Sequence, residues 1–164
     1  MAWSTLLAGE LPDADKLLTL FTEVRQLAAY KTADETVNNS AVLQDDNDLF
    51  VAVGASKVYL LNLDIVQSSG TSPDFKFTLT LPSGGSGYLN VFAHAETNVV
   101  TTLVGLPTDT FALAGVAADA SVKVTGYITT SAAGTVQLQW AQNGNVVSDT
   151  IVRKGGTLVL RQIL

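Results

Sequence analysis

The feature that most constrains the fold of this chain is the alternation of apolar and polar residues over short segments. Segment 75–81 reads FKFTLTL, in which every second residue is large and apolar, and segment 57–67 alternates in a similar way. A period of two places successive side chains on opposite faces of a β-strand. Val, Thr and Ile make up 42 of the 164 residues, and β-branched side chains fit a pleated surface. The sequence therefore predicts a mainly β fold.

Turn-forming residues divide the chain into short strands at regular spacing. Asn143-Gly144, between two alternating runs, is the strongest signal for a β-hairpin. Strands so spaced, without intervening helices, predict an antiparallel jelly-roll-like β-sandwich of about eight to ten strands. The expected strands cover residues 49–53, 57–67, 75–81, 88–96, 98–104, 109–114, 120–130, 134–142, 146–152 and 157–163.

The first third of the chain has a different character. Residues 12–30 predict one short helix, because apolar residues recur there at steps of three and four. Polar linkers are expected over 34–39 and 44–48. We therefore divide the chain into an N-terminal arm with a helix, residues 1–35, and a β-sandwich domain, residues 36–164. The apolar helical stripe consists of Leu17, Leu20, Phe21, Val24, Leu27 and Ala28.

Composition excludes several classes of function. Charged residues are only 15% of the chain, against about 25% in a typical soluble domain. The net charge is −6, and residues 1–48 carry all of it, with nine acidic and three basic residues. An acidic chain lacks the basic surface that nucleic acids require. No apolar run is long enough for a transmembrane helix, and the absence of Cys excludes thiolate sites. No segment resembles a secretory signal, so we expect synthesis in the cytoplasm.

We expect no catalytic, cofactor or metal site. His94 is the only histidine and no nucleophile motif accompanies it. The acidic run 44–48 has carboxylates that suit calcium, but it lacks the Gly and Glu of an EF-hand loop. We interpret this run as a strand-entry loop and leave cation binding by residues 45–48 open. The glycine-rich segment 82–87 precedes a strand, not a helix, so it predicts a hairpin loop and not a phosphate site.

The two tryptophans suggest different roles. Trp140 shares a strand face with Val136 and Leu138, which indicates core packing, with a glycan-stacking platform as the alternative. Trp3 lies in the N-terminal arm, where an aromatic side chain is suited to anchor an interface.

Several stretches of the chain resemble small β-sandwich virion proteins of tailed bacteriophages, chiefly those of actinobacterial hosts. Residues 37–40, VNNS, followed by residues 43–49, LQDDNDL, are the most characteristic of them. The resemblance follows the same order over nearly the full length and implies a structural role without catalytic residues. The other matching stretches are Trp3 with residues 8–10, then 16–17, 24–25, 73–77, 81–84, 138–143 and 152–156.

The resemblance implies two possible places in a virion. The first is a capsid decoration protein, a homotrimer that binds the exterior of the major capsid protein lattice and stabilises the head. The second is a tail, collar or fibre protein that recognises host surface glycan through exposed aromatic residues such as Tyr88 or Tyr127. The chain has no collagen-like tract or long heptad region for a fibre shaft, which favours decoration. An enzyme is not expected. We predict that the contacts to the lattice or to other subunits involve Trp3, Leu7, Leu17, Leu20, Phe21 and Val24.

Overall fold

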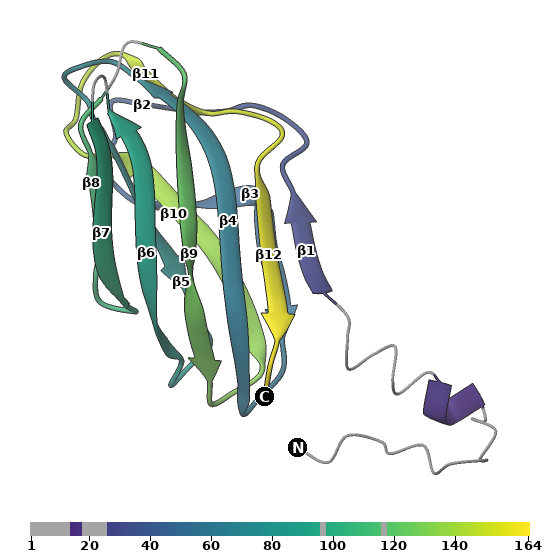
Figure 1. The fold of residues 1–164 in the computed structure, drawn as a ribbon. Coiled ribbons are helices and arrows are strands. Elements are labelled where there is room, and N and C mark those ends of the chain that lie inside the picture. The colour runs from purple at the N-terminus through teal and green to yellow at the C-terminus, as the bar shows by residue number, and fades with distance from the viewer. Residues whose placement is uncertain (1–13, 18–25, 96–97, 116–117) are drawn as a thin grey trace.

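The computed structural model describes residues 14–17, 26–95, 98–115 and 118–164. A short helix covers residues 14–17, and every other regular element is a β-strand in an antiparallel pair (Figure 1). The predicted antiparallel β-sandwich with a short N-terminal helix is therefore confirmed, and the jelly-roll topology stays a prediction. The described strands are β1 (Gln26–Tyr30), β2 (Glu35–Asn38), β3 (Gln44–Val53), β4 (Lys57–Ser69), β5 (Phe75–Thr80), β6 (Ser86–Ala95), β7 (Asn98–Leu106), β8 (Phe111–Leu113), β9 (Ala120–Thr130), β10 (Gly134–Gln142), β11 (Asp149–Val152) and β12 (Thr157–Gln162).

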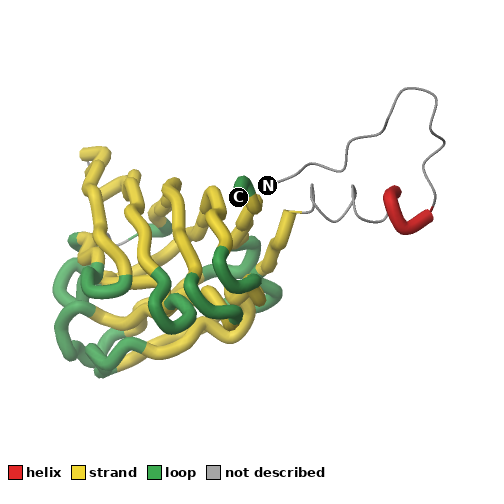
Figure 2. The backbone as a smooth tube through the Cα atoms, turned by 90° about the horizontal axis from the view of Figure 1, so that it is seen from below, coloured by secondary structure: helices red, strands yellow, loops and turns green. Residues whose placement is uncertain are grey.

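Two sheets form the sandwich. The larger has eight strands, with the order β1-β12-β4-β9-β6-β7, and β11 pairs with both β2 and β4. The smaller has four strands in the order β3-β10-β5-β8. Figure 2 shows the two sheets as stacked layers.

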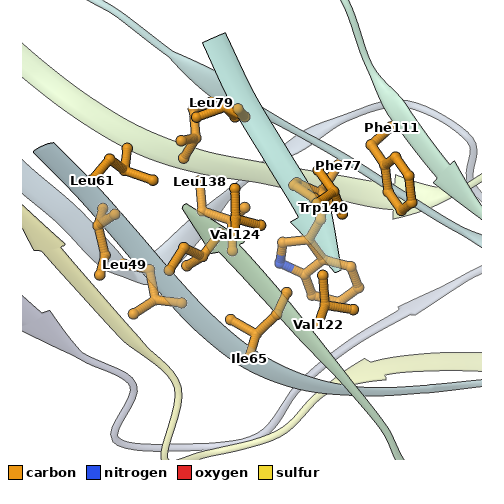
Figure 3. Packing of buried hydrophobic residues seen from close by; sticks show 14 of the residues in the cluster. Leu49, Leu61, Ile65, Phe77, Leu79, Phe111, Val122, Val124, Leu138 and Trp140 are labelled. Atoms are coloured by element: carbon orange, nitrogen blue, oxygen red, sulfur yellow. The ribbon is translucent and has the colours of Figure 1, made fainter. Parts of the chain in front are cut away.

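The core lies between the two layers. The inward residues of β4 are Tyr59, Leu61, Leu63 and Ile65, all at most 2% exposed. They face Leu138 and Trp140 from the smaller sheet, as Figure 3 shows for several of these side chains. Burial of a large apolar side chain contributes about 1.5–3 kcal/mol, so the alternation that predicts the strands also supplies the stability of the sandwich.

The helix predicted over residues 12–30 does not extend to residue 30 in the structure. Its described part covers residues 14–17, residues 18–25 lie outside the described residues, and Gln26–Tyr30 forms β1. β1 pairs with β12 over five residues, and Leu27 and Ala29 pack against the core. The prediction was wrong for this end because apolar residues at 27 and 29 fit a strand as well as a helix, and pairing with β12 decided between them.

Both predicted linkers contain strands. Glu35–Asn38 forms β2, which pairs with β11, and residues 44–48 form the first half of β3. These segments are polar because their side chains make hydrogen bonds, as the site below shows. Together with β1, they bring the number of described strands to twelve instead of the expected eight to ten.

The hairpin predicted at Asn143-Gly144 is also wrong. β10 belongs to the smaller sheet and β11 to the larger, so this turn carries the chain from one layer to the other. The amide groups of Asn143 and Gly144 donate to the carbonyl oxygen of Pro73, both at 2.9 Å. The loop 82–87 likewise connects β5 in one sheet to β6 in the other. Turn residues specify a change of direction, and the core then selects the sheet that the next strand joins.

Gln26–Tyr30 of the predicted arm forms β1 and Glu35 begins β2, so this part of the arm belongs to the sandwich. The division at residue 35 stays a prediction. Within the described ranges, no helix has the length and apolar character needed to cross a membrane.

Candidate functional site

The predicted interface residues fall almost entirely outside the described part of the chain. Leu17 is described: it lies in the short helix and is 39% exposed. An exposed leucine there is available to a partner, and the interface stays a prediction. The residues outside the described ranges are Trp3, Leu7, Leu20, Phe21 and Val24.

The acidic run 44–48 distributes its carboxylates among different partners. Asp45 accepts a hydrogen bond from the side chain of Gln139 at 2.7 Å, while Asp48 accepts from the amide and the hydroxyl of Thr32 at 2.8 and 3.1 Å. The Thr32 amide is the main reason that the pKa of Asp48 lies below its ordinary value. In the described ranges, no group of three or more His, Cys, Asp or Glu side chains is placed to hold a metal ion.

Asp46 turns inward and meets a buried lysine. Lys31 follows β1 and is 1% exposed, and Asp46 is 0% exposed. The ammonium nitrogen Nζ of Lys31 lies 2.7 Å from Asp46 Oδ2 and 2.9 Å from Glu35 Oε2. Burial acts to lower the pKa of Lys31, but hydrogen bonds and charge attraction from Asp46 and Glu35 outweigh it and raise that pKa. Lys31, Glu35 and Asp46, here called the buried triad, connect the two sheets.

Neighbouring groups fix both carboxylates of the buried triad. The backbone amides of Asp48 and Leu49 donate to Asp46 Oδ1 at 3.0 and 2.9 Å. The side chain of Gln44 donates to Glu35 Oε1 at 2.8 Å, and the amide of Asn47 donates to Glu35 Oε2 at 3.1 Å. A buried charge is tolerated when its hydrogen-bonding capacity is met in this way.

Sequence reasoning placed Asp46 in a strand-entry loop. One signal was present: Lys31 and Glu35 are four residues apart and flank a polar stretch. Neither residue points to Asp46 by spacing, because the contact spans fifteen residues.

A second group of ion pairs lies near the surface and includes Asp34, three residues after Lys31. Arg153 donates to Asp119 at 3.0 Å and to Asp34 at 3.1 Å. The backbone amide of Lys154 donates to Asp34 at 2.8 Å and is the main cause that lowers the pKa of Asp34, followed by Arg153. Residues 31–35 are thus fixed to β3 on one side and to the turn after β11 on the other.

The outer face of the eight-stranded sheet carries an exposed aromatic pair. Tyr88 on β6 and Tyr127 on β9 are cross-strand partners, with 51% and 43% of their surfaces exposed. Their ring centroids lie 6.2 Å apart with the planes tilted by 52°. Such an arrangement is typical of favourable aromatic contacts.

Glycines on the inner side allow β6 and β9 to approach closely at this pair. Both strands carry a Gly-Tyr dipeptide, with Gly87 opposite Ile128 and Gly126 opposite Leu89. A Cβ at Gly87 would lie 2.3 Å from the Tyr127 carbonyl oxygen, and one at Gly126 would lie 2.2 Å from that of Tyr88. Neither distance is possible for a real side chain, so the position of the Tyr pair depends on both glycines. The sequence shows the two dipeptides, but their alignment is a product of register.

Polar and charged side chains continue the same face. Asn90 on β6, Thr125 on β9 and Asn62 on β4 form the next row across the strands, two residues along from the Tyr pair. Phe92, Lys123 and Asp64 form the row after that, and Phe92 is 39% exposed. A shallow hollow of about 240 Å³ adjoins this last row, between β4, β9 and the turn at 155–156. We call the rows of Tyr88, Asn90 and Phe92 the aromatic face.

The remaining candidates have structural positions. Trp140 is 0% exposed and its ring lies 6.1 Å from that of Phe75, so core packing is confirmed and the stacking platform is not formed by this residue. His94 lies in β6, and its side chain lies outside what the structure describes. The glycine-rich loop 82–87 closes through a hydrogen bond from the Gly85 amide to the Pro82 carbonyl at 2.8 Å.

Five described carboxylates of the β body each have a different hydrogen-bond or ion-pair partner. The acceptors and their donors are Asp64 with Lys123, Asp74 with the Gly115 amide, Asp109 with the Gly105 amide, Asp119 with Arg153 and Asp149 with Asn38.

Comparison with known proteins does not show a family for this chain. No protein-family model matches the chain, and no curated protein matches its sequence. Among solved structures, a chain from the tripod (BppUct-A-L) of the baseplate of bacteriophage Tuc2009 is similar over 98% of this chain and 78% of its own length. The identity is 13% and the TM-score 0.35, a likeness too distant to carry an argument about function.

Proposed function

We propose that this chain is a non-enzymatic structural protein of a bacteriophage virion. The resemblance implies a β-sandwich, which is the fold observed. The observation that carries the proposal is the position of residues 43–49, the second part of its most characteristic stretch. Through Asp46 and Asp48, this stretch holds Lys31 and Thr32, so it fixes the end of the N-terminal arm to the sandwich. A module attached by an arm needs a rigid joint of this kind.

Within the virion, the proposed role is capsid decoration. The arm, with the predicted contacts at Trp3, Leu7, Leu17, Leu20, Phe21 and Val24, binds the exterior of the major capsid protein lattice or the neighbouring copy in a homotrimer. The sandwich projects outward. Many weak contacts repeated around a closed shell then stabilise the head.

Binding to capsids tests this role. Undecorated capsids are mixed with the full chain and with a variant that begins at Gln26, which keeps β1 but lacks the preceding arm. The full chain is expected to sediment with capsids at high copy number and the shortened chain to stay in solution. Immunogold labelling of virions is expected to mark the head. Failure of the folded full chain to bind, or label confined to the tail, would contradict decoration.

The aromatic face supports a second candidate, a tail or fibre protein that recognises host surface glycan. The exposed rings of Tyr88 and Tyr127 lie beside the side-chain amides of Asn90 and Asn62 on a charge-poor surface. Aromatic rings contact the apolar face of a sugar, and hydroxyl and amide groups bond to its hydroxyls. Ordinary monomer surfaces seldom gather aromatic side chains in this way.

A binding measurement with host cell-wall polysaccharide tests this candidate. Tyr127→Ala is expected to reduce binding at least tenfold, because it removes half of the exposed pair. Tyr30→Ala is the matched control, since Tyr30 is 60% exposed on β1 of the same sheet, several strands away. Absence of binding by the wild-type chain, or equal losses in both variants, would contradict glycan recognition by the aromatic face.

A further inference from the structure

The buried triad brings a primary amine into contact with a carboxyl group in the interior of the sandwich. Lys31 Nζ is 2.7 Å from Asp46 Oδ2, and both side chains are at most 1% exposed. The carboxyl carbon of Asp46 is bonded to Oδ2. Its distance from Nζ therefore exceeds the Nζ–Oδ2 distance by at most one carbon–oxygen bond length. Fixed proximity of this kind replaces a collision between separate molecules and lowers the barrier to reaction.

The hydrogen bonds to the Asp46 carboxyl group favour attack by an amine on its carbon atom. Its Oδ1 accepts hydrogen bonds from the amides of Asp48 and Leu49 at 3.0 and 2.9 Å. Two backbone donors on one oxygen stabilise the negative charge that develops there when a nucleophile adds to the carbon. The other oxygen, Oδ2, faces the amine and is free to leave.

Glu35 is placed to accept a proton from the attacking amine. Its Oε2 lies 2.9 Å from Lys31 Nζ, and its other oxygen is fixed by the side chain of Gln44 at 2.8 Å. The side chain of Glu35 is 12% exposed, so it lies at the boundary between the interior and solvent. A carboxylate within hydrogen-bond reach of the nucleophile meets the geometric requirement for general acid–base catalysis.

We propose that Lys31 and Asp46 form an intramolecular amide bond, with Glu35 as the catalytic proton carrier. Nζ gives a proton to Glu35 and attacks Cγ of Asp46, and the charge on Oδ1 is stabilised by the two amides. Two protons in total pass from Nζ through Glu35 to Oδ2, which leaves as water. The net change converts one ammonium and one carboxylate into one amide and one water, and Glu35 returns to its carboxylate form. No oxidant, cofactor or further reactant takes part.

The product removes two charges from a buried site. A charged pair in the interior bears a large desolvation penalty, and a neutral amide does not. The bond joins the residue that follows β1 to β3 and closes a loop across fifteen residues. It thereby fixes the end of the N-terminal arm to the opposite sheet covalently. This inference concerns the chain itself and does not depend on its location in a virion.

Tryptic peptide mapping of the purified full chain tests the proposal. Arg25, Lys31 and Lys57 are consecutive cleavage sites, so an unlinked chain yields peptides 26–31 and 32–57. The linked chain is expected to resist cleavage after Lys31 and to yield one peptide, 26–57, that is lighter by one water. Tandem fragmentation places the link between residues 31 and 46. Internal cyclisation of an aspartate also loses water, but it leaves Lys31 cleavable and so is distinguished.

Three variants test the roles of the residues. Glu35→Gln keeps the shape of the side chain and is expected to yield the separate peptides while circular dichroism still shows a folded sandwich. Asp46→Asn provides a second test, because any link in this variant forms with loss of ammonia instead of water. Asp45→Asn is the matched control, since the Asp45 side chain bonds to Gln139 and not to Nζ, and it is expected to remain linked.

Two results would overturn the proposal. Recovery of peptides 26–31 and 32–57 from folded wild-type protein means that Lys31 and Asp46 form only an ion pair. A linked Glu35→Gln variant means that Glu35 does not carry the protons.

Discussion

Two lysine–aspartate pairs in this protein share their chemistry and differ in their surroundings. Lys31 and Asp46 lie 2.7 Å apart with side chains 1% and 0% exposed. Lys123 and Asp64, on the outer face of the eight-stranded sheet, lie 3.5 Å apart with side chains 59% and 51% exposed. Water solvates the second pair in either state, so its contact adds little to stability. The first pair has no water to replace a lost partner, and its removal leaves a charge in the interior.

The largest expected effect comes from Lys31→Met. The substitution keeps most of the side-chain volume but leaves Asp46 without its cation, and removing one member of a buried pair costs about 3–5 kcal/mol. Urea denaturation followed by circular dichroism measures this loss of unfolding free energy. An amide bond in the wild-type chain adds to the loss. A loss below about 1 kcal/mol would show that burial does not set the two pairs apart.

Acid is expected to weaken the contacts that Asp34 and Asp48 make with residues 32, 153 and 154. The pKa values of Asp34 and Asp48 lie below the ordinary 3.8 in the folded chain. A carboxyl with a depressed pKa contributes stability above that ordinary value, and the contribution is lost as pH falls through the folded-state pKa. The thermal midpoint should therefore fall steeply below about pH 4. Asp48→Asn should show a shallower fall, and an unchanged slope would contradict this account.

Arg153→Gln tests a pair of intermediate exposure. Arg153 is 33% exposed and holds both Asp34 and Asp119. Its loss is expected to lower the thermal midpoint by less than Lys31→Met does, because water reaches the carboxylates that remain. The acid slope should also become shallower, since Arg153 is the second cause of the low pKa of Asp34. A midpoint below that of Lys31→Met would reverse the ranking by burial.

The smallest effect is expected from Lys123→Met, the matched control for Lys31→Met. An exposed pair of this kind contributes about 0–1 kcal/mol, and salt screens what it contributes. Denaturation at low and high ionic strength measures both quantities. A loss as large as that of Lys31→Met would show that the exposed row of Phe92, Lys123 and Asp64 has a structural role that its solvent exposure does not reveal.

The strands of the β body could be predicted from sequence, and the site could be predicted only in part. Alternation identified β4 and β5 because one face of each strand is buried, and burial imposes a period of two. The same logic placed Trp140 in the core. Tyr88 and Tyr127 were identified as exposed aromatics, but their contact depends on the register between β6 and β9, which no local pattern specifies.

The errors have a common physical cause. Segment 26–30 has too few apolar residues for their spacing to distinguish a helix from a strand. Pairing with β12 makes it a strand. Asn143-Gly144 turns the chain, but the turn contains nothing that selects the sheet that β11 joins. The acidic residues of 44–48 suggested a loop because a strand with polar inward residues is unusual, and Asp46 is inward only because Lys31 meets it there.

By itself, the sequence determined a β-rich sandwich with an acidic arm, because alternation, β-branched residues and charge distribution act locally along the chain. The tertiary structure decided which strands are neighbours, which turns cross between sheets, and which two of fifteen acidic residues meet the buried lysine. These choices depend on contacts between distant segments, such as the fifteen-residue separation of Lys31 and Asp46. Their free energy exists only once both sheets have assembled and excluded water from the space between them.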